Sequence, residues 1–202
     1  MSEEGAHFAY ASGFDKMNAN PNGREILLMM GPLCMMLPLL LGTAKDNVPA
    51  EWVRFEPAGG RYSIAMPAKP TVSKKAVKTE SAKLEAVIAV AEGMGNSYFV
   101  VSYCDYPKKE LKKDSIDKRL EQGCKAAAEN AGGEIRNKEK ISIDGHPGRE
   151  IAIEKNGELI ARMQLYLVDG RLYQLMVLGD AAFFAGNEKD VRTFLGSFRL
   201  VK

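Results

Sequence analysis

The sequence predicts an α+β fold in which a largely antiparallel sheet of about 8–9 strands carries two helices. Three observations predict it. Short apolar segments come in two consecutive groups, turn dipeptides separate the segments of the second group, and two stretches with helical periodicity stand apart from both groups. Because consecutive strands pair antiparallel when no helix alternates with them, the pattern indicates an α+β sandwich and excludes a doubly wound parallel sheet.

The overall composition is typical of a globular protein. The 202 residues are 46% hydrophobic and 27% charged, and the formal net charge is +2. These values exclude a disordered tail, a disulfide-dense miniprotein and a polytopic membrane protein. The near-neutral net charge argues against a nucleic-acid partner, because proteins that bind nucleic acid carry a strong excess of basic residues. The chain has two His and three Cys, which are few ligands for a metal site. We also expect no cofactor.

The N-terminal segment resembles a secretory signal. Residues 26–41 are uncharged and almost wholly apolar, Arg24 precedes them, and Gly42-Thr43-Ala44 follows as a small-residue cleavage site. A spanning helix needs roughly 20 apolar residues, so an uncleaved anchor to the cytoplasmic membrane through residues 26–41 is the alternative. We therefore expect export to a periplasmic or extracytoplasmic location, with 1–44 as polar leader plus signal peptide, 45–51 as linker and 52–202 as one α+β domain.

The first group of strands follows the linker. Trp52 and Phe55 indicate a short initial strand, and Gly-, Pro- and Lys-rich turns then separate four apolar segments. Gly93-Met94-Gly95 predicts a hairpin turn and not a dinucleotide site, because strands follow it and the third glycine of that motif is missing. The four predicted strands are Arg61–Met66, Thr71–Thr79, Leu84–Ala91 and Ser97–Tyr103.

A helix separates the two strand groups. Asp114 or Ser115 can cap its start, and Gly132-Gly133 ends it after Asn130. Apolar residues recur three or four positions apart, which predicts one buried face. That face comprises Ile116, Leu120, Cys124, Ala127 and Ala131.

Four strands joined by tight turns follow between Lys138 and Leu178. Asp144-Gly145, Asn156-Gly157 and Asp169-Gly170 accept the positive φ values of type I′ turns, which predicts an antiparallel meander. The last of these strands, Arg171–Leu178, is apolar on both faces and is therefore expected at the centre of the sheet.

The chain is expected to end with a helix and a strand. The second helix begins at Asn187, with Asp190 at the reciprocal capping position. It buries Val191, Phe194 and Leu195, and the final strand carries Phe198 and Leu200.

Catalytic motifs are absent from the sequence, so we expect no enzyme. There is no G-x-S-x-G elbow, H-E-x-x-H pair, C-x-x-C or phosphate-binding loop. Cys104 and Cys124 could form a disulfide in an exported protein, remain buried free thiols, or supply a catalytic thiol. His146 begins a strand after a turn; the enzymatic alternative is a hydrolase or thiol enzyme that pairs it with Cys104, Cys124 or Glu150.

Two loops are candidates for partner contact. Phe183-Phe184, in the loop before the second helix, either fills the core or contacts a partner. A basic cluster precedes the first helix and is either a solvated loop or a contact for an anionic partner. Its members are Lys108, Lys109, Lys112 and Lys113.

Four segments carry a resemblance to known proteins. They are Gly60-Arg61-Tyr62-Ser63-Ile64-Ala65-Met66-Pro67, Gly145-His146-Pro147-Gly148-Arg149-Glu150, Arg171-Leu172-Tyr173-Gln174-Leu175 and Phe194-Leu195-Gly196-Ser197-Phe198. Together they resemble an exported bacterial family of unknown function. The order of strands and helices also resembles the PsbP/Mog1 fold, an α/β/α sandwich.

The resemblance carries a functional expectation. Members of the PsbP/Mog1 fold act as accessory and protein-binding modules, in photosystem assembly or on a Ran-type GTPase. This implies a non-enzymatic extracytoplasmic module that binds another protein or envelope component, touches a membrane only through an uncleaved N-terminal segment, and inherits no site residue from the fold. The alternative is a small-molecule or lipid carrier, which would need an enclosed apolar pocket.

Overall fold

The computed structural model describes residues 52–78, 83–107 and 115–201 and confirms the α+β fold. A sheet of seven antiparallel strands dominates it, in the order β3-β4-β5-β9-β8-β7-β6. The strands are β3 (Thr71–Lys78), β4 (Lys83–Glu92), β5 (Tyr98–Asp105), β6 (Glu134–Ile143), β7 (His146–Lys155), β8 (Glu158–Val168) and β9 (Arg171–Leu178). The predicted leader and linker lie outside the described residues.

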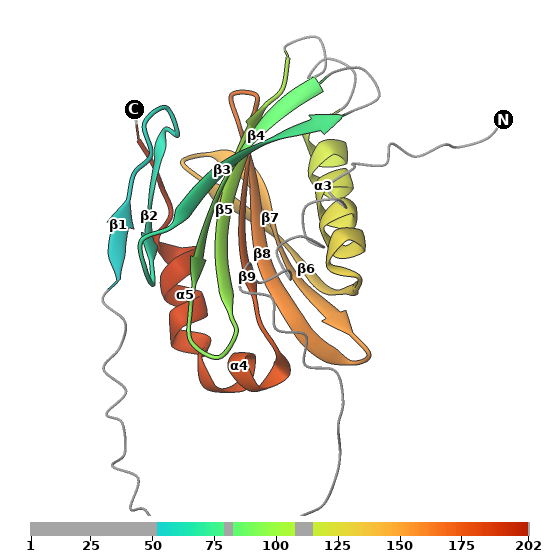
Figure 1. The fold of residues 1–202 in the computed structure, drawn as a ribbon. Helices are drawn as coiled ribbons and strands as arrows, with labels where there is room; N and C mark the ends of the chain where they lie inside the picture. The colour runs from blue at the N-terminus through green and yellow to red at the C-terminus, as the bar shows by residue number, and fades with distance from the viewer. Residues whose placement is uncertain (1–51, 79–82, 108–114, 202) are drawn as a thin grey trace, which may run out of the picture.

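A smaller sheet and three helices complete the described part of the chain (Figure 1). Strand β2 lies between β1 and β10 and pairs antiparallel with both. These elements are β1 (Val53–Phe55), β2 (Tyr62–Met66), β10 (Arg199–Leu200), α3 (Ile116–Ala131), α4 (Ala181–Gly186) and α5 (Glu188–Ser197). None of the described helices is both long enough and apolar enough to cross a bilayer.

The predicted meander turns are confirmed by their backbone angles. Asp144, Asn156 and Asp169 have φ values of 48°, 55° and 47°, and the glycine after each has 81°, 82° and 88°. Two consecutive residues with positive φ are what a type I′ turn requires. The hairpin turn between β4 and β5 is also present, with Gly93 donating its N–H to the Ser97 carbonyl at 2.8 Å.

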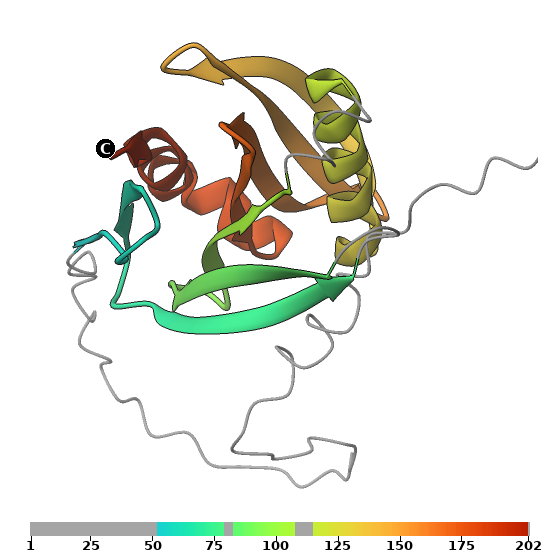
Figure 2. The same ribbon diagram turned by 90° about the horizontal axis from the view of Figure 1, so that it is seen from above.

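The main sheet separates two hydrophobic cores, because β9 is central and buried on both faces as predicted. On one face, Leu120 and Cys124 of α3 pack against Leu165 and its neighbours. The other face packs against α4, α5 and the small sheet, with Phe99 and Phe194 at its centre. Figure 2 shows α3 on one side of the curved sheet and α4 and α5 on the other.

Helix α3 follows its predicted bounds closely. The Ser115 hydroxyl accepts a hydrogen bond from the Lys118 N–H at 3.2 Å, and Gly132 ends the helix with φ 66°. Leu120 and Cys124 of the predicted apolar face are buried and Ala127 and Ala131 are partly buried, whereas Ile116 in the first turn is 48% exposed. The prediction that Ile116 belongs to the buried face is therefore wrong.

The region before α5 differs from the prediction. Residues 181–186 form α4, a helix of only six residues, where the sequence indicates a loop. Asp180 caps it by accepting a 2.7 Å hydrogen bond from the Phe183 N–H. Asn187 precedes α5 as expected but makes no side-chain cap; its amide donates to the Phe183 carbonyl at 3.0 Å. The predicted reciprocal cap with Asp190 is therefore absent, because α4 takes the Asn187 side chain.

Candidate functional site

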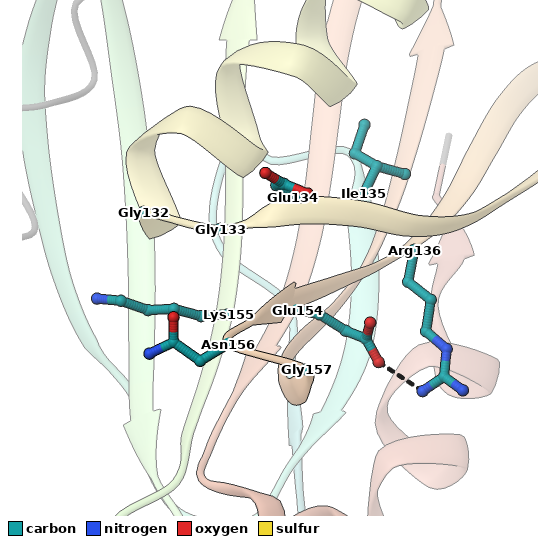
Figure 3. Close-up of a pocket in the computed structure, with 9 residues that line it drawn as sticks. All are labelled: Gly132, Gly133, Glu134, Ile135, Arg136, Glu154, Lys155, Asn156 and Gly157. Carbon is teal, nitrogen blue, oxygen red and sulfur yellow. Dashed lines mark hydrogen bonds and ion pairs between the residues drawn. The ribbon is translucent and has the colours of Figure 1, made fainter.

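The candidate site is an open cleft at one end of the main sheet, drawn in Figure 3. It has a volume of about 570 Å³ and lies between the end of α3, the start of β6 and the turn that joins β7 to β8. Its lining residues are Gly132, Gly133, Glu134, Ile135, Arg136, Glu154, Lys155, Asn156 and Gly157. The lining is mostly polar side chains and exposed backbone.

Two irregularities of the sheet lie beside this cleft. The β6–β7 register shifts between Ile135 and Asn137, which leaves Arg136 outside the ladder. The β7–β8 register shifts between Ile153 and Glu154. Bulges bend a strand and redirect its side chains, and they are frequent next to functional sites. Here they open the corner of the sheet and turn Arg136 toward Glu154, whose carboxylate accepts its hydrogen bond at 2.5 Å.

The cleft also depends on a close approach of α3 to β7. A Cβ at Gly133 would lie 2.4 Å from the Glu154 carbonyl oxygen, so only glycine fits there. The last turn of α3 contains no basic residue, and Lys155 of β7 brings its ammonium group close to Gly132 at the helix C-terminus. A cation is favourable at this negative end of the helix dipole.

The charges that line the cleft are balanced. Glu134 and Glu154 contribute negative charge, and Arg136 and Lys155 contribute positive charge. Within the described ranges, no group of three or more His, Cys, Asp or Glu residues could hold a metal ion. The arrangement suits a polar ligand with both charge signs, such as a peptide segment, better than an apolar molecule.

A second polar cluster lies where β5 and β9 meet the small sheet. The Arg171 side chain is 8% exposed, and it donates to both carboxylate oxygens of Asp105 at 2.6 Å. It also donates to the carbonyls of Gly59 and Gly60 at 2.7 and 2.8 Å, and its guanidinium lies 4.2 Å from the Tyr103 ring centroid. The hydrogen bond from Arg171 lowers the pKa of Asp105. This cluster fastens the β1–β2 turn to the main sheet.

The four sequence segments named above, of which Gly60–Pro67 is the first and Phe194–Phe198 the last, meet beside this cluster. The Tyr62 ring centroid lies 5.8 Å from that of Tyr173 and 5.5 Å from that of Phe198. Phe198 in turn stacks on Tyr166, with centroids 5.8 Å apart. A Cβ at Gly148 would lie 2.6 Å from the Tyr166 ring, so the second segment needs its glycine. The aromatic residues of these segments lie in the core, and none of the segments lines the cleft.

The candidate thiols do not form a disulfide. Cys104 and Cys124 are both free and buried in the core beneath α3. Burial raises the pKa of Cys104 to about 12 and that of Cys124 to about 11. A thiol needs its thiolate form to attack, so neither residue has the properties of a nucleophile. Of the three alternatives that the sequence left open for these cysteines, the structure agrees with two buried free thiols.

His146 and the cysteines lie on opposite faces of the main sheet. On β7, Arg149 pairs with Leu165, which belongs to the core that contains Cys104 and Cys124. His146 is an odd number of residues from Arg149, so its side chain points to the other face. The structure therefore does not bring the histidine and a thiol together.

Glu150 shares the face of His146 but is engaged by other partners. Its two carboxylate oxygens accept hydrogen bonds from Arg162 Nη2 and Gln164 Nε2, both at 2.7 Å. Arg162 also pairs with Glu188 of α5 at 2.9 Å. Glu150 thus belongs to a polar network that joins β7 and β8 to α5.

Of the remaining candidate residues, the two phenylalanines lie in the core and the four lysines lie outside the described residues. Phe183 and Phe184 are buried, at 4% and 7% exposure, and Phe183 contacts Phe99 edge to face at 6.2 Å. Neither ring is on the surface, so both residues fill the core and do not form a surface contact. Lys108, Lys109, Lys112 and Lys113 lie outside the described residues.

Of the residues that line the cleft, the sequence pointed only to the glycines, and it identified them as turns. Gly132-Gly133 and Asn156-Gly157 were predicted as a helix end and a hairpin turn, but no pattern places them side by side. The two bulges that open the cleft have no signature in the sequence.

No protein-family model matches the chain, and no curated protein matches it. Among solved structures, it is similar to the solution structure of cyanobacterial PsbP (CyanoP) from Synechocystis sp. PCC 6803. The identity is 12%, the TM-score is 0.43, and the match covers 79% of this chain and 98% of that chain. A likeness at this level assigns neither a partner nor an activity.

Proposed function

We propose that the chain is a non-enzymatic extracytoplasmic accessory module that binds another protein or an envelope component through the cleft of Figure 3. The observation that carries the proposal is the cleft itself, an open polar corner built by two bulges and a helix end. Its balanced charges and exposed backbone suit a polypeptide segment. Extracytoplasmic location is supported by the signal-like segment that ends at Ala44.

The geometry of the ionisable groups favours binding over catalysis. The raised thiol pKa values of Cys104 and Cys124 disfavour a nucleophile, and His146 lies across the sheet from both. A lipid or small-molecule carrier is also less favoured, because the cleft is open and polar.

Photocrosslinking in the source cells tests the cleft. A photoreactive amino acid replaces Glu134 or Lys155, both at the cleft, or Lys189 on α5 as the matched exposed control. We expect a discrete crosslinked product, identified by mass spectrometry, from each cleft position and none from Lys189. Adducts from Lys189 alone, or from no position, would contradict the proposal.

Export is tested separately. Mass spectrometry of the N-terminus of the protein recovered from the envelope should find a chain that starts at Lys45. An intact N-terminus on protein recovered in the cytoplasmic fraction would overturn export and leave the crosslinking result to stand alone.

A further inference from the structure

Strand β3 forms one outer edge of the main sheet in the described part of the chain. It pairs with β4 through eight consecutive residues, from Thr71 opposite Val90 to Lys78 opposite Lys83, without a register shift. A regular edge strand exposes a row of N–H and C=O groups that can pair with another extended chain.

The chain segment that contains β3 is rich in positive charge. Residues 57–79 contain no Asp or Glu but five basic residues, which are Arg61, Lys69, Lys74, Lys75 and Lys78. Lys74 is held along the sheet by Glu85 of β4, whose carboxylate oxygen lies 2.8 Å from its Nζ. Val72 is 50% exposed and is the most exposed large apolar side chain of the described residues.

The other outer strand of the main sheet, β6, does not combine a regular register with positive charge. Strand β6 is interrupted by the bulge at Arg136, and its charges alternate in sign through Lys138, Glu139 and Lys140. Bulges are a common protection against strand pairing, and edge lysines repel another basic strand but not an acidic one. The contrast between a regular basic edge and a bulged mixed edge singles out β3.

We propose that β3 is a second contact surface, which takes an acidic extended segment of a partner protein as an added antiparallel or parallel strand. The backbone of β3 would provide the pairing, Val72 an apolar contact, and Lys74 and Lys75 the charge complementarity. A second copy of the chain fits poorly, because lysines would then face lysines. This inference rests on the proposed function, since it names the chemistry of a partner for the same binding module.

Short peptides test the surface on the full chain. The probe is the peptide acetyl-(Glu-Val)4-amide, and the matched control, acetyl-(Glu-Pro)4-amide, has the same charge but cannot form a strand. We expect the probe to bind at least about tenfold more tightly than the control and to slow amide hydrogen exchange along β3. Equal affinity for the two peptides, or no binding of the probe, would overturn the proposal. Binding of phosphatidylglycerol vesicles without binding of the probe would likewise overturn it, in favour of a membrane surface.

Charge variants test the role of the lysines. The double variant Lys74→Glu/Lys75→Glu should weaken probe binding at least about tenfold, because it reverses the charge that the peptide meets. Lys140→Glu/Lys189→Glu makes the same change in net charge on β6 and α5, and it should leave the affinity within about twofold. Equal losses in both double variants would show a general charge effect and contradict a site at β3.

Proline variants test strand pairing. Consecutive N–H groups point to opposite sides of a strand, so one of Val72→Pro and Ser73→Pro removes an outward N–H and spares the pairing with β4. The variant that keeps the wild-type thermal stability should lose probe binding; retention of binding would contradict the proposal. Crosslinked adducts at Glu134 and Lys155 without probe binding would overturn the β3 surface alone and leave the proposed function in place.

Discussion

Arg171 is the buried cation on which the attachment of the small sheet depends. Its side chain pairs with both oxygens of Asp105 and with the carbonyls of Gly59 and Gly60. Arg171→Leu should lower the free energy of unfolding by roughly 2–4 kcal/mol, because carbonyls and a carboxylate lose their donors. Urea denaturation measures the change. Arg192→Leu is the control, since that side chain is 76% exposed and should cost less than about 0.5 kcal/mol. Equal losses would contradict the role of Arg171.

The same pair predicts a pH dependence of stability. The hydrogen bond from Arg171 lowers the pKa of Asp105 in the folded chain. The folded state therefore gains stability from ionised Asp105 above the unfolded pKa of about 4, and this gain is lost as the pH falls through the lower folded value. Asp105→Asn should thus be less stable than wild type at pH 7, and the difference should become smaller at pH 2. Urea titrations at both values check this, and a constant difference would contradict it.

The two buried thiols predict slow chemical labelling. Because burial raises the pKa of Cys104 and Cys124, both should react with a maleimide at pH 8 roughly 100-fold more slowly in the folded chain than in urea. Peptide mapping by mass spectrometry, without reductant, follows each cysteine. Labelling of both in urea is expected; failure of both to react there would indicate a disulfide and contradict the free thiols.

At the scale of elements, local sequence signals predicted what local interactions determine. The three Asx-Gly turns and the ends of α3 depend on backbone angles and caps within a few residues, and each was predicted near its observed position. Helix α4 was missed because six residues are too short to show a helical period. The cap predicted at Asn187 failed because that side chain bonds to α4 instead.

Two glycines offer opposite tests of this local control. Gly145 has φ 81° and open space around it, so Gly145→Ala should lower the free energy of unfolding by about 1 kcal/mol through backbone strain alone. Gly196 lies within α5 and also has open space around it. Gly196→Ala should therefore raise the free energy of unfolding by about 0.5–1 kcal/mol. Thermal and urea unfolding measure both. The same sign for both variants would contradict the assigned conformations.

At the scale of the molecule, the sequence predicted the layers but not their contacts. The central position of β9 followed from its two apolar faces, whereas the meeting of Gly133 with Glu154 depends on how α3 lies on the sheet. Periodicity states which face of an element is buried and not which residues it meets. The cleft could therefore not be predicted, although the glycines that line it were recognised as turns.

The core that the small sheet shares with one face of the main sheet predicts that the described fold unfolds as one unit. Trp52, the single tryptophan, lies with its ring centroid 5.7 Å from that of Phe99, so its fluorescence reports the contact of the β1 region with the main sheet. Far-ultraviolet circular dichroism reports the strands themselves. If the small sheet and the main sheet share one core, the two signals should change at the same urea concentration.

Truncation of a shared ring sharpens this test. Phe198 contacts Tyr62 of the small sheet and Tyr166 of the main sheet. Phe198→Ala should lower the free energy of unfolding by roughly 3–5 kcal/mol and shift both signals together, because the cavity lies between the two sheets. An earlier fluorescence transition in wild type or variant would mean that the small sheet detaches by itself, and one cooperative domain over residues 52–202 would then be wrong.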